Sequence, residues 1–233
     1  MMLFNRLLGD LFGLLFPDLC CGCGNYLYHA EAQLCTVCLH QLPYTDHHLH
    51  AENKAARQLW GRLPCNAVLS LLYFKKGSRT QNIIHHLKYK GRKDLGVKLG
   101  NMIAHKLLLS AAYEGIDLII PVPLHISRER QRGYNQSLCI AEGIAAILKV
   151  PLSTNSLLRK KRTASQTKKG RYTRFENMQQ VFSIADQQIL RGKHILLVDD
   201  VITTGATLEA CGMLLFENSI GKLSIATVAF ADT

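Results

Sequence analysis

The sequence that decides the fold is Ile195-Leu-Leu-Val-Asp-Asp-Val-Ile-Thr-Thr-Gly-Ala-Thr207. Its apolar start predicts a buried strand that places Asp199 and Asp200 at its carboxyl end. The loop that follows runs directly into a predicted helix. Ligands of open parallel sheets collect at this edge, because the polar ends of several strands meet there. The stretch therefore predicts a ligand site where the strand ends.

The loop after the strand has the composition of a phosphate site. Small residues let successive backbone N–H groups turn towards one anion, and the following helix adds the positive end of its dipole. Carboxylates beside a phosphate repel it unless they accept hydrogen bonds from hydroxyls, so we expect a sugar diol on the acids and a ribose 5-phosphate as ligand. The alternative is that the two acids only cap a helix. The loop residues are Thr203, Thr204, Gly205, Ala206 and Thr207.

The surrounding chain alternates short apolar runs with segments whose apolar residues recur every three or four positions. This alternation predicts an α/β fold, with a parallel sheet covered by helices on both faces. We expect an N-terminal module over residues 1–52 and the α/β domain over 53–233. The predicted strands are 67–74, 117–123, 194–200 and 223–230, and the predicted helices are 53–63, 79–89, 95–113, 134–149 and 206–218.

The first residues, 1–17, carry leucines at helical spacing, interrupted by Arg6 and Asp10. We expect an amphipathic helix packed on its own protein, with a helix on a membrane surface as the alternative. The sequence holds no apolar run long enough for a transmembrane span. We therefore expect a cytoplasmic protein whose cysteines are thiols or metal ligands rather than disulfides.

Four of the eight cysteines form two pairs with two residues inside each pair, Cys20 with Cys23 and Cys35 with Cys38. This spacing lets both thiolates of a tight turn point at one ion, and four cysteines predict structural Zn²⁺. Ligation through Cys21 in place of a neighbour stays open. The other alternative is a loop of free thiols.

The positive charge is concentrated in two segments. The chain has 28 Lys and Arg against 17 Asp and Glu, a net charge of +11, of which residues 75–93 supply seven cations and 157–174 supply eight, both without an acid. Such segments favour a polyanion or a phosphorylated ligand over two solvated loops. With Tyr172 and Phe175 available for stacking, the second segment resembles a single-stranded DNA surface as much as a catalytic lid. Its cations are Arg159, Lys160, Lys161, Arg162, Lys168, Lys169, Arg171 and Arg174.

The segment Val198-Asp-Asp-Val-Ile-Thr-Thr-Gly-Ala-Thr207 resembles the phosphoribosyl pyrophosphate signature of type I phosphoribosyltransferases. From Cys20 to Phe230 the chain is also similar to the ComF/GntX family, in which a cysteine-rich ribbon precedes such a domain. Further matching stretches are His86-Leu-Lys-Tyr-Lys-Gly91, Pro121-Val-Pro-Leu124, Arg130-Gln-Arg-Gly-Tyr-Asn-Gln-Ser137, and the series Gln166, Arg174, Asn177 and Phe182.

The resemblance implies a role for each part of the site. Asp199 and Asp200 would hold the ribose hydroxyls, and the loop 203–207 would hold the 5-phosphate. Lys88 and Arg132 would face pyrophosphate, and Mg²⁺ would bridge pyrophosphate and ribose oxygens. The second basic segment falls where type I enzymes carry a flexible loop. The chain has no separate element that recognises a base.

Two functions follow as expectations. As a ComF-type protein, the chain would serve DNA uptake in natural transformation, binding single-stranded DNA and a helicase-like partner while retaining phosphoribosyl pyrophosphate. The alternative is an active Mg²⁺-dependent phosphoribosyltransferase that joins a nitrogenous acceptor to phosphoribosyl pyrophosphate. We favour the first, because eight uncompensated cations exceed what one pyrophosphate neutralises.

Overall fold

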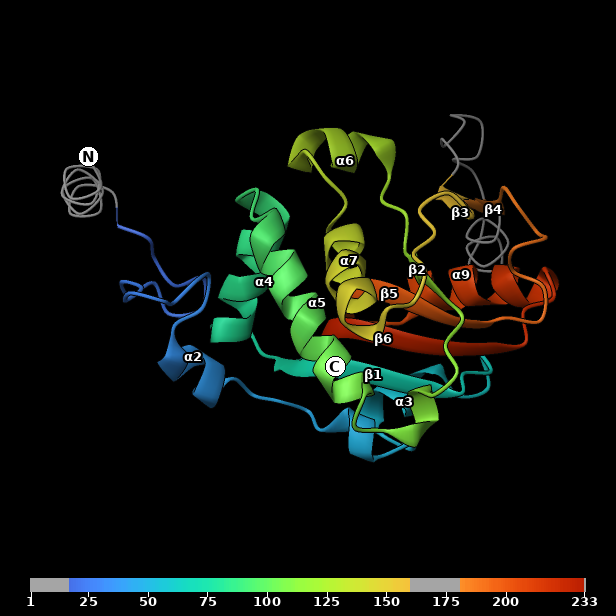
Figure 1. Cartoon of the computed structure of the whole chain (residues 1–233), viewed down its shortest axis with the longest axis horizontal. Coiled ribbons are helices and arrows are strands. Elements are labelled where there is room, and N and C mark those ends of the chain that lie inside the picture. Colours follow the sequence, from blue (N-terminus) through green and yellow to red (C-terminus); the bar gives the residue numbers. More distant parts are fainter. Residues whose placement is uncertain (1–16, 160–180, 233) are drawn as a thin grey trace, which may run out of the picture.

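The computed structural model describes residues 17–159 and 181–232. Its centre is a parallel sheet in the order β1-β6-β5-β2, which confirms the predicted α/β fold class (Figure 1). The strands are β1 (Ala67–Phe74), β2 (Leu118–Pro121), β5 (His194–Ile202) and β6 (Lys222–Ala231). All four lie within a residue or two of their predicted positions, or inside them, because continuous apolar runs identify buried parallel strands.

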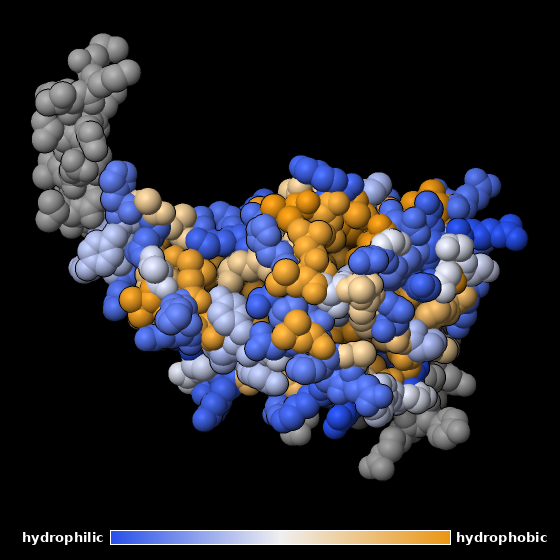
Figure 2. Space-filling view, turned by 60° about the horizontal axis from the view of Figure 1, so that its bottom comes forward, coloured by the Kyte–Doolittle hydropathy of each residue, from blue (hydrophilic) through white to orange (hydrophobic). Residues whose placement is uncertain are grey.

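Helices cover both faces of the sheet. One face packs on α4 (Arg79–Tyr89), α5 (Lys93–Leu107) and α7 (Gln136–Leu148), and the other on α3 (Lys54–Leu59) and α9 (Ala206–Glu217). Alternate residues of β5 therefore enter opposite cores: Leu196 and Val198 pack towards α5 and α7, and Ile195 and Leu197 towards α9. On the side seen in Figure 2, hydrophobic side chains gather near the centre and hydrophilic ones around it.

The helices α5 and α7 approach each other closely at two glycines. A Cβ added at Gly100 would lie 2.1 Å from the carbonyl oxygen of Ile140, and one added at Gly143 would lie 2.2 Å from that of Val97. Any larger residue would push the helices apart. This contact fixes α7, whose first turn forms part of the site described below.

Three parts of the helix prediction were wrong. The predicted helix 95–113 ends at Leu107 and continues only as a 3-10 turn, η2 (Ala111–Tyr113), and the predicted helix 53–63 is limited to α3. Two short helices, α2 (Thr36–Gln41) and α6 (Ile126–Arg132), were missed. Neither has the apolar periodicity that the prediction relied on, since α6 buries no residue and α2 buries only Cys38. A further 3-10 turn is η1 (His47–Leu49).

A second, two-stranded sheet pairs β3 (Leu157–Arg159) with β4 (Phe182–Ile184) in antiparallel register. Arg159 is the last described residue before the gap, and its guanidinium carbon lies 5.2 Å from the ring centre of Phe182. The other seven cations predicted to contact nucleic acid fall at 160–174, outside the described residues, as does the predicted helix in residues 1–16. Within the described ranges, none of the helices is long and apolar enough to span a membrane.

The cysteine-rich segment lies against α4 and α5, beside the sheet domain (Figure 1). Asn82 on α4 donates to the carbonyl oxygen of Gly22 at 2.9 Å, and Lys98 on α5 donates to that of Ala32 at 2.6 Å. Cys20, Cys35 and Cys38 share one core with these helices. The segment is therefore packed on the sheet domain through its own apolar contacts, and a boundary at residues 52 and 53 remains a prediction.

Candidate functional site

The acid pair lies near the carboxyl end of β5, as the sequence predicts, although the strand continues for two residues beyond Asp200. The Asp199 side chain accepts two hydrogen bonds at one oxygen, from the Ser137 hydroxyl at 2.9 Å and from the Asp200 backbone N–H at 2.8 Å. Ser137 stands in the first turn of α7, so that helix holds the acid in one orientation. The second oxygen of Asp199 makes no hydrogen bond or salt bridge with the described residues.

Asp200 is held by a cation from a different element. Lys88 near the end of α4 places its Nζ 3.0 Å from Oδ2 of Asp200, and both side chains are mostly buried, with 22% and 13% exposed. An ion pair that is shielded from water is stronger than one on the surface. The structure therefore brings Lys88, which the resemblance assigned to the ligand site, directly to the acid pair.

The two neighbouring carboxylates influence each other's ionisation. Burial of Asp199, together with the negative charge of Asp200, raises the pKa of Asp199 to about 7. The hydrogen bonds from Asp200 and Ser137, and the charge of Lys88, oppose this rise. Such a shift is common where a group meets a ligand rather than only solvent.

The loop 203–207 leads from β5 into α9. Gly205 has a φ of +74° and occupies the residue before the first turn of the helix, with the backbone N–H of Ala206 3.4 Å from the Thr204 hydroxyl oxygen. A left-handed φ favours glycine because it has no Cβ. Thr203 and Thr204 are exposed. The loop therefore presents hydroxyl groups and a helix N-terminus at the same edge as the acids, which suits an anion.

Side chains from α3 and the residues just after it hold the backbone carbonyl groups of this loop. We call Gln58, Arg62 and the Arg62 partner Glu209 the clamp. Arg62, just after α3, donates to the Thr204 carbonyl oxygen at 3.0 Å and pairs with the buried Glu209 carboxylate at 2.9 Å. Gln58 donates to the carbonyl oxygen of Thr203. A Cβ at Gly205 would lie 2.6 Å from the Leu59 side chain. Both carbonyls are thus turned towards α3, which leaves the backbone N–H groups of the loop for the opposite side.

Arg132, the second cation that the resemblance implies, is the last residue of α6. It donates to the Gln136 side chain at 2.7 Å, and its guanidinium carbon lies 5.5 Å from the ring centre of Tyr89. Tyr89 follows Lys88 in sequence, so Arg132 is close to the same end of α4. A contact of Arg132 with pyrophosphate remains a prediction.

The four predicted ligand cysteines form a metal-binding cluster. The Sγ atoms of Cys20, Cys23, Cys35 and Cys38 all lie within 4.8 Å of one another. A tetrahedron with Zn–S bonds of about 2.3 Å has sulfur atoms about 3.8 Å apart. The separation of 3.7 Å between Cys23 and Cys35 fits that value. The cluster can therefore hold a metal such as zinc.

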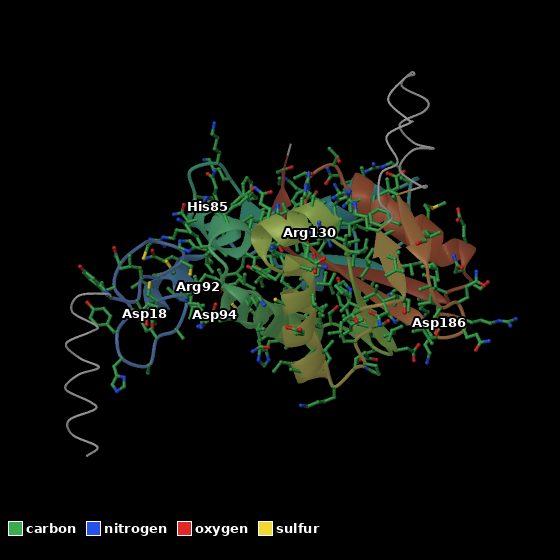
Figure 3. The ribbon with its side chains drawn as sticks, turned by 90° about the horizontal axis from the view of Figure 1, so that it is seen from above. Asp18, His85, Arg92, Asp94, Arg130 and Asp186 are labelled. Carbon is green, nitrogen blue, oxygen red and sulfur yellow. The ribbon has the colours of Figure 1, made fainter. Side chains whose placement is uncertain are left out.

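The backbone around the cluster supports thiolates. The N–H groups of Gly22 and Cys35 lie 3.4 and 3.3 Å from Sγ of Cys20, and a Cβ at Gly22 would lie 2.9 Å from Sγ of Cys38. The sulfur atoms gather in the segment beside Asp18 and Arg92 (Figure 3). Cys21 is buried but is not a member of the cluster, so the geometry favours Cys20 and Cys23 as ligands over Cys21.

Comparison with known proteins agrees with this geometry. Residues 135–232 match the phosphoribosyl transferase domain, over a region that includes the acid pair and the loop. This part of the chain is therefore similar to a phosphoribosyl transferase domain. The match begins at Asn135, which caps α7, and ends at residue 232, directly after β6.

The relatives and a solved structure extend the comparison. Competence protein F of Haemophilus influenzae is 28% identical over 207 residues, which cover 88% of this chain and 82% of that protein. DNA utilization protein YhgH of Salmonella typhi is 27% identical over 146 residues, 61% of this chain and 63% of that protein, so the match spans less than two thirds of its length. These matches confirm the resemblance to the ComF/GntX family. The structure of glutamine phosphoribosylpyrophosphate amidotransferase from B. subtilis aligns with a TM-score of 0.45 and 18% identity, covering 61% of this chain and 30% of that one.

Several residues that shape this site were not predicted from the sequence. Ser137 on α7 and the clamp of Gln58, Arg62 and Glu209 were not singled out, because each contacts the site across 62 to 147 positions of sequence. One sequence feature could have indicated Ser137, since it ends the stretch 130–137 that resembles the family. None indicated Arg62.

Proposed function

We propose that this chain is a ComF-type protein of DNA uptake whose phosphoribosyl transferase domain binds phosphoribosyl pyrophosphate. One observation carries the proposal: the acid pair, the loop 203–207 and Lys88 all meet at one edge of the sheet. The names of the relatives, competence protein F and DNA utilization protein, support the role in DNA handling.

Each part of the site has a task in this binding mode. The oxygens of Asp199 and Asp200 accept hydrogen bonds from the ribose hydroxyls, and the loop backbone with Thr203, Thr204 and Thr207 donates to the 5-phosphate. Lys88 lies beside the acids, where it would balance the charge of the pyrophosphate, assisted by Arg132. Two carboxylates are too few for an all-protein cage, which suits a Mg²⁺ ion held largely by phosphate oxygens and water.

The acid pair fits such a ligand for an electrostatic reason. The Asp199 oxygen without a partner among the described residues is a strong acceptor next to a second carboxylate. A ribose diol supplies two hydroxyl donors to this pair, and a cation such as Mg²⁺ relieves its repulsion. Free phosphate supplies neither the two hydroxyl donors nor the cation. The pair therefore selects a sugar phosphate over free phosphate.

DNA binding is the second half of the proposal. Its support is the concentration of cations in residues 75–93 and 157–174, together with the names of the relatives. A helicase-like partner belongs to the same proposal. The cysteine cluster, with Zn²⁺ as its proposed metal, would hold the N-terminal segment in the shape that packs on α4 and α5.

A titration of the purified protein tests both halves. Phosphoribosyl pyrophosphate with Mg²⁺ is titrated calorimetrically, and an unlabelled oligothymidine is titrated separately. Binding of both is expected. Binding of DNA alone would contradict the sugar-phosphate site, and binding of phosphoribosyl pyrophosphate alone would contradict the role in DNA uptake. Release of pyrophosphate on addition of nitrogenous bases would support the transferase alternative.

A further inference from the structure

The C-terminal end of α4 and the helix α6 form one continuous surface. The guanidinium carbon of Arg132 in α6 lies 5.5 Å from the centre of the Tyr89 ring in α4. Tyr134, which follows α6, donates its hydroxyl to the carbonyl oxygen of Leu87. Figure 3 shows α4 with His85 and α6 with Arg130 together in the view from above. Two elements separated by some forty residues thus present their side chains on one side of the molecule.

This surface carries two aromatic rings that are exposed to solvent rather than packed in the core. Tyr89 is 58% exposed, and the His85 ring lies 5.2 Å from it at an angle of 45°. An exposed Tyr next to an Arg plane gives flat groups on which an unpaired base can stack.

The same surface is strongly basic, and only some of its cations are paired with an acid. Lys88 pairs with Asp200, and Arg92 binds Asp94 through two hydrogen bonds of 3.0 and 3.1 Å. Lys90 and Arg130 have no carboxylate from the described residues within salt-bridge distance. The helix α6 itself contains three arginines and one glutamate. These charges are available to a polyanion.

We propose that this surface binds single-stranded DNA, with a base stacked on Tyr89 and the phosphate backbone held by the cations around it. We call it the Tyr89 surface; its residues are His85, Tyr89, Lys90, Lys93, Arg130 and Arg132. A duplex hides the faces of its bases, whereas a single strand exposes them to rings and guanidinium planes. The combination of exposed rings and unneutralised cations therefore selects the single strand.

The proposal rests on the proposed function and adds to it a place for the strand. Lys88, the neighbour of Tyr89, contacts Asp200 in the sugar-phosphate site. The Tyr89 surface therefore adjoins that site and shares Arg132 with it, so a strand bound on this surface lies beside the proposed phosphoribosyl pyrophosphate site. The surface consists of described residues only and shares none of them with the predicted basic segment 157–174.

The test measures binding of a fluorescent fifteen-residue oligothymidine by anisotropy at several salt concentrations. Tyr89→Ala should weaken binding by about 5- to 100-fold, which corresponds to the loss of one stacked base. Tyr89→Phe should bind like the wild type, because it retains the ring. Lys90→Gln with Arg130→Gln should reduce the slope of log affinity against log salt by about 1.4, at about 0.7 for each phosphate contact.

Matched control positions lie on other parts of the molecule, outside the Tyr89 surface. Tyr28, which is 80% exposed in the cysteine-rich segment, supplies Tyr28→Ala, and the exposed Lys193 and Lys222 supply a double Gln variant. Neither control should change DNA binding by more than about twofold. Circular dichroism and thermal unfolding check that each variant is folded, and titration with phosphoribosyl pyrophosphate checks that the neighbouring site is intact.

Two results would overturn the proposal, and they differ from a failure of the proposed function. If the wild type binds the oligonucleotide while Tyr89→Ala and the double variant bind equally well, the strand lies elsewhere and only the Tyr89 surface is rejected. If Tyr89→Ala weakens a fifteen-base-pair duplex as much as the single strand, the surface is a general polyanion site. A wild type that binds no single strand at any salt concentration would reject the DNA-binding function itself.

Discussion

Lys88 on α4 and Asp200 on β5 are 112 positions apart in sequence, yet Nζ of the lysine lies 3.0 Å from a carboxylate oxygen of the aspartate. The pair joins the end of a helix to the end of the central strand. It also keeps a cation beside two carboxylates that would otherwise repel each other, since Asp199 lies next in the chain. The pair thus serves both the fold and the site.

Breaking this pair should lower both stability and ligand affinity. Lys88→Gln leaves Asp200 without its cation, and we expect the free energy of unfolding to fall by about 1–3 kcal/mol. Asp200→Asn alone should cost a similar amount, and the double variant less than the sum of the two. A double-mutant cycle from urea unfolding measures the coupling. Additive losses would show that the two side chains do not interact.

The raised pKa of Asp199 predicts a pH dependence of stability. Its pKa is about 7 in the folded chain against 3.8 when unperturbed, so between these values the folded state holds the proton more tightly than the unfolded state. The free energy of unfolding therefore falls as pH rises from about 4 to 7. Asp199→Asn should flatten this part of the profile, measured by urea unfolding at several pH values. Glu142→Gln, at an exposed position of α7, is the control and should leave the slope unchanged.

The clamp holds the loop 203–207, so a change in the clamp should lower ligand affinity. Arg62→Lys cannot reproduce the two contacts to the Thr204 carbonyl and Glu209, because lysine lacks the planar fork. We expect about a tenfold or larger loss of affinity for phosphoribosyl pyrophosphate, with the chain still folded. The control is Arg57→Lys at an exposed position of α3. Equal affinities of the two variants would show that the clamp does not shape the loop.

The cysteine cluster predicts one metal ion per chain. Cys35→Ser should release the metal and loosen the segment on α4 and α5, since it opens a four-ligand site. Cys21→Ala should retain the metal, because Cys21 lies outside the cluster. Elemental analysis of protein purified without chelators measures both. Loss of the metal in Cys21→Ala together with its retention in Cys20→Ala would assign the ligand role to Cys21.

The sequence predicts the sheet and the acid pair well for a physical reason. Buried parallel strands are short, continuous apolar runs, so β1 and β5 stand out, and the residue where such a run ends lies at the ligand edge. The spacing of the cysteines likewise predicts their cluster, because the two short loops restrict where the sulfur atoms lie.

The features that were missed depend on contacts between distant residues. The helix α6 has no apolar face and is held by its ends, as in the contact of Arg132 with Tyr89. The clamp of Arg62 and the hydrogen bond from Ser137 to Asp199 form only after α3, α7 and β5 have packed. No local pattern in one sequence encodes such pairings, and Lys88 was found only through the resemblance to a family.

Binding of phosphoribosyl pyrophosphate at the acid pair is tested by calorimetric titration of phosphoribosyl pyrophosphate with Mg²⁺ into the wild type and into the double variant Asp199→Asn with Asp200→Asn. Both side chains stand at a strand end, and their replacement by amides of equal size should leave the chain folded, as circular dichroism would verify. We expect saturable binding to the wild type and an affinity at least about a hundredfold lower in the double variant. Equal affinity in the two proteins would contradict binding at the acid pair.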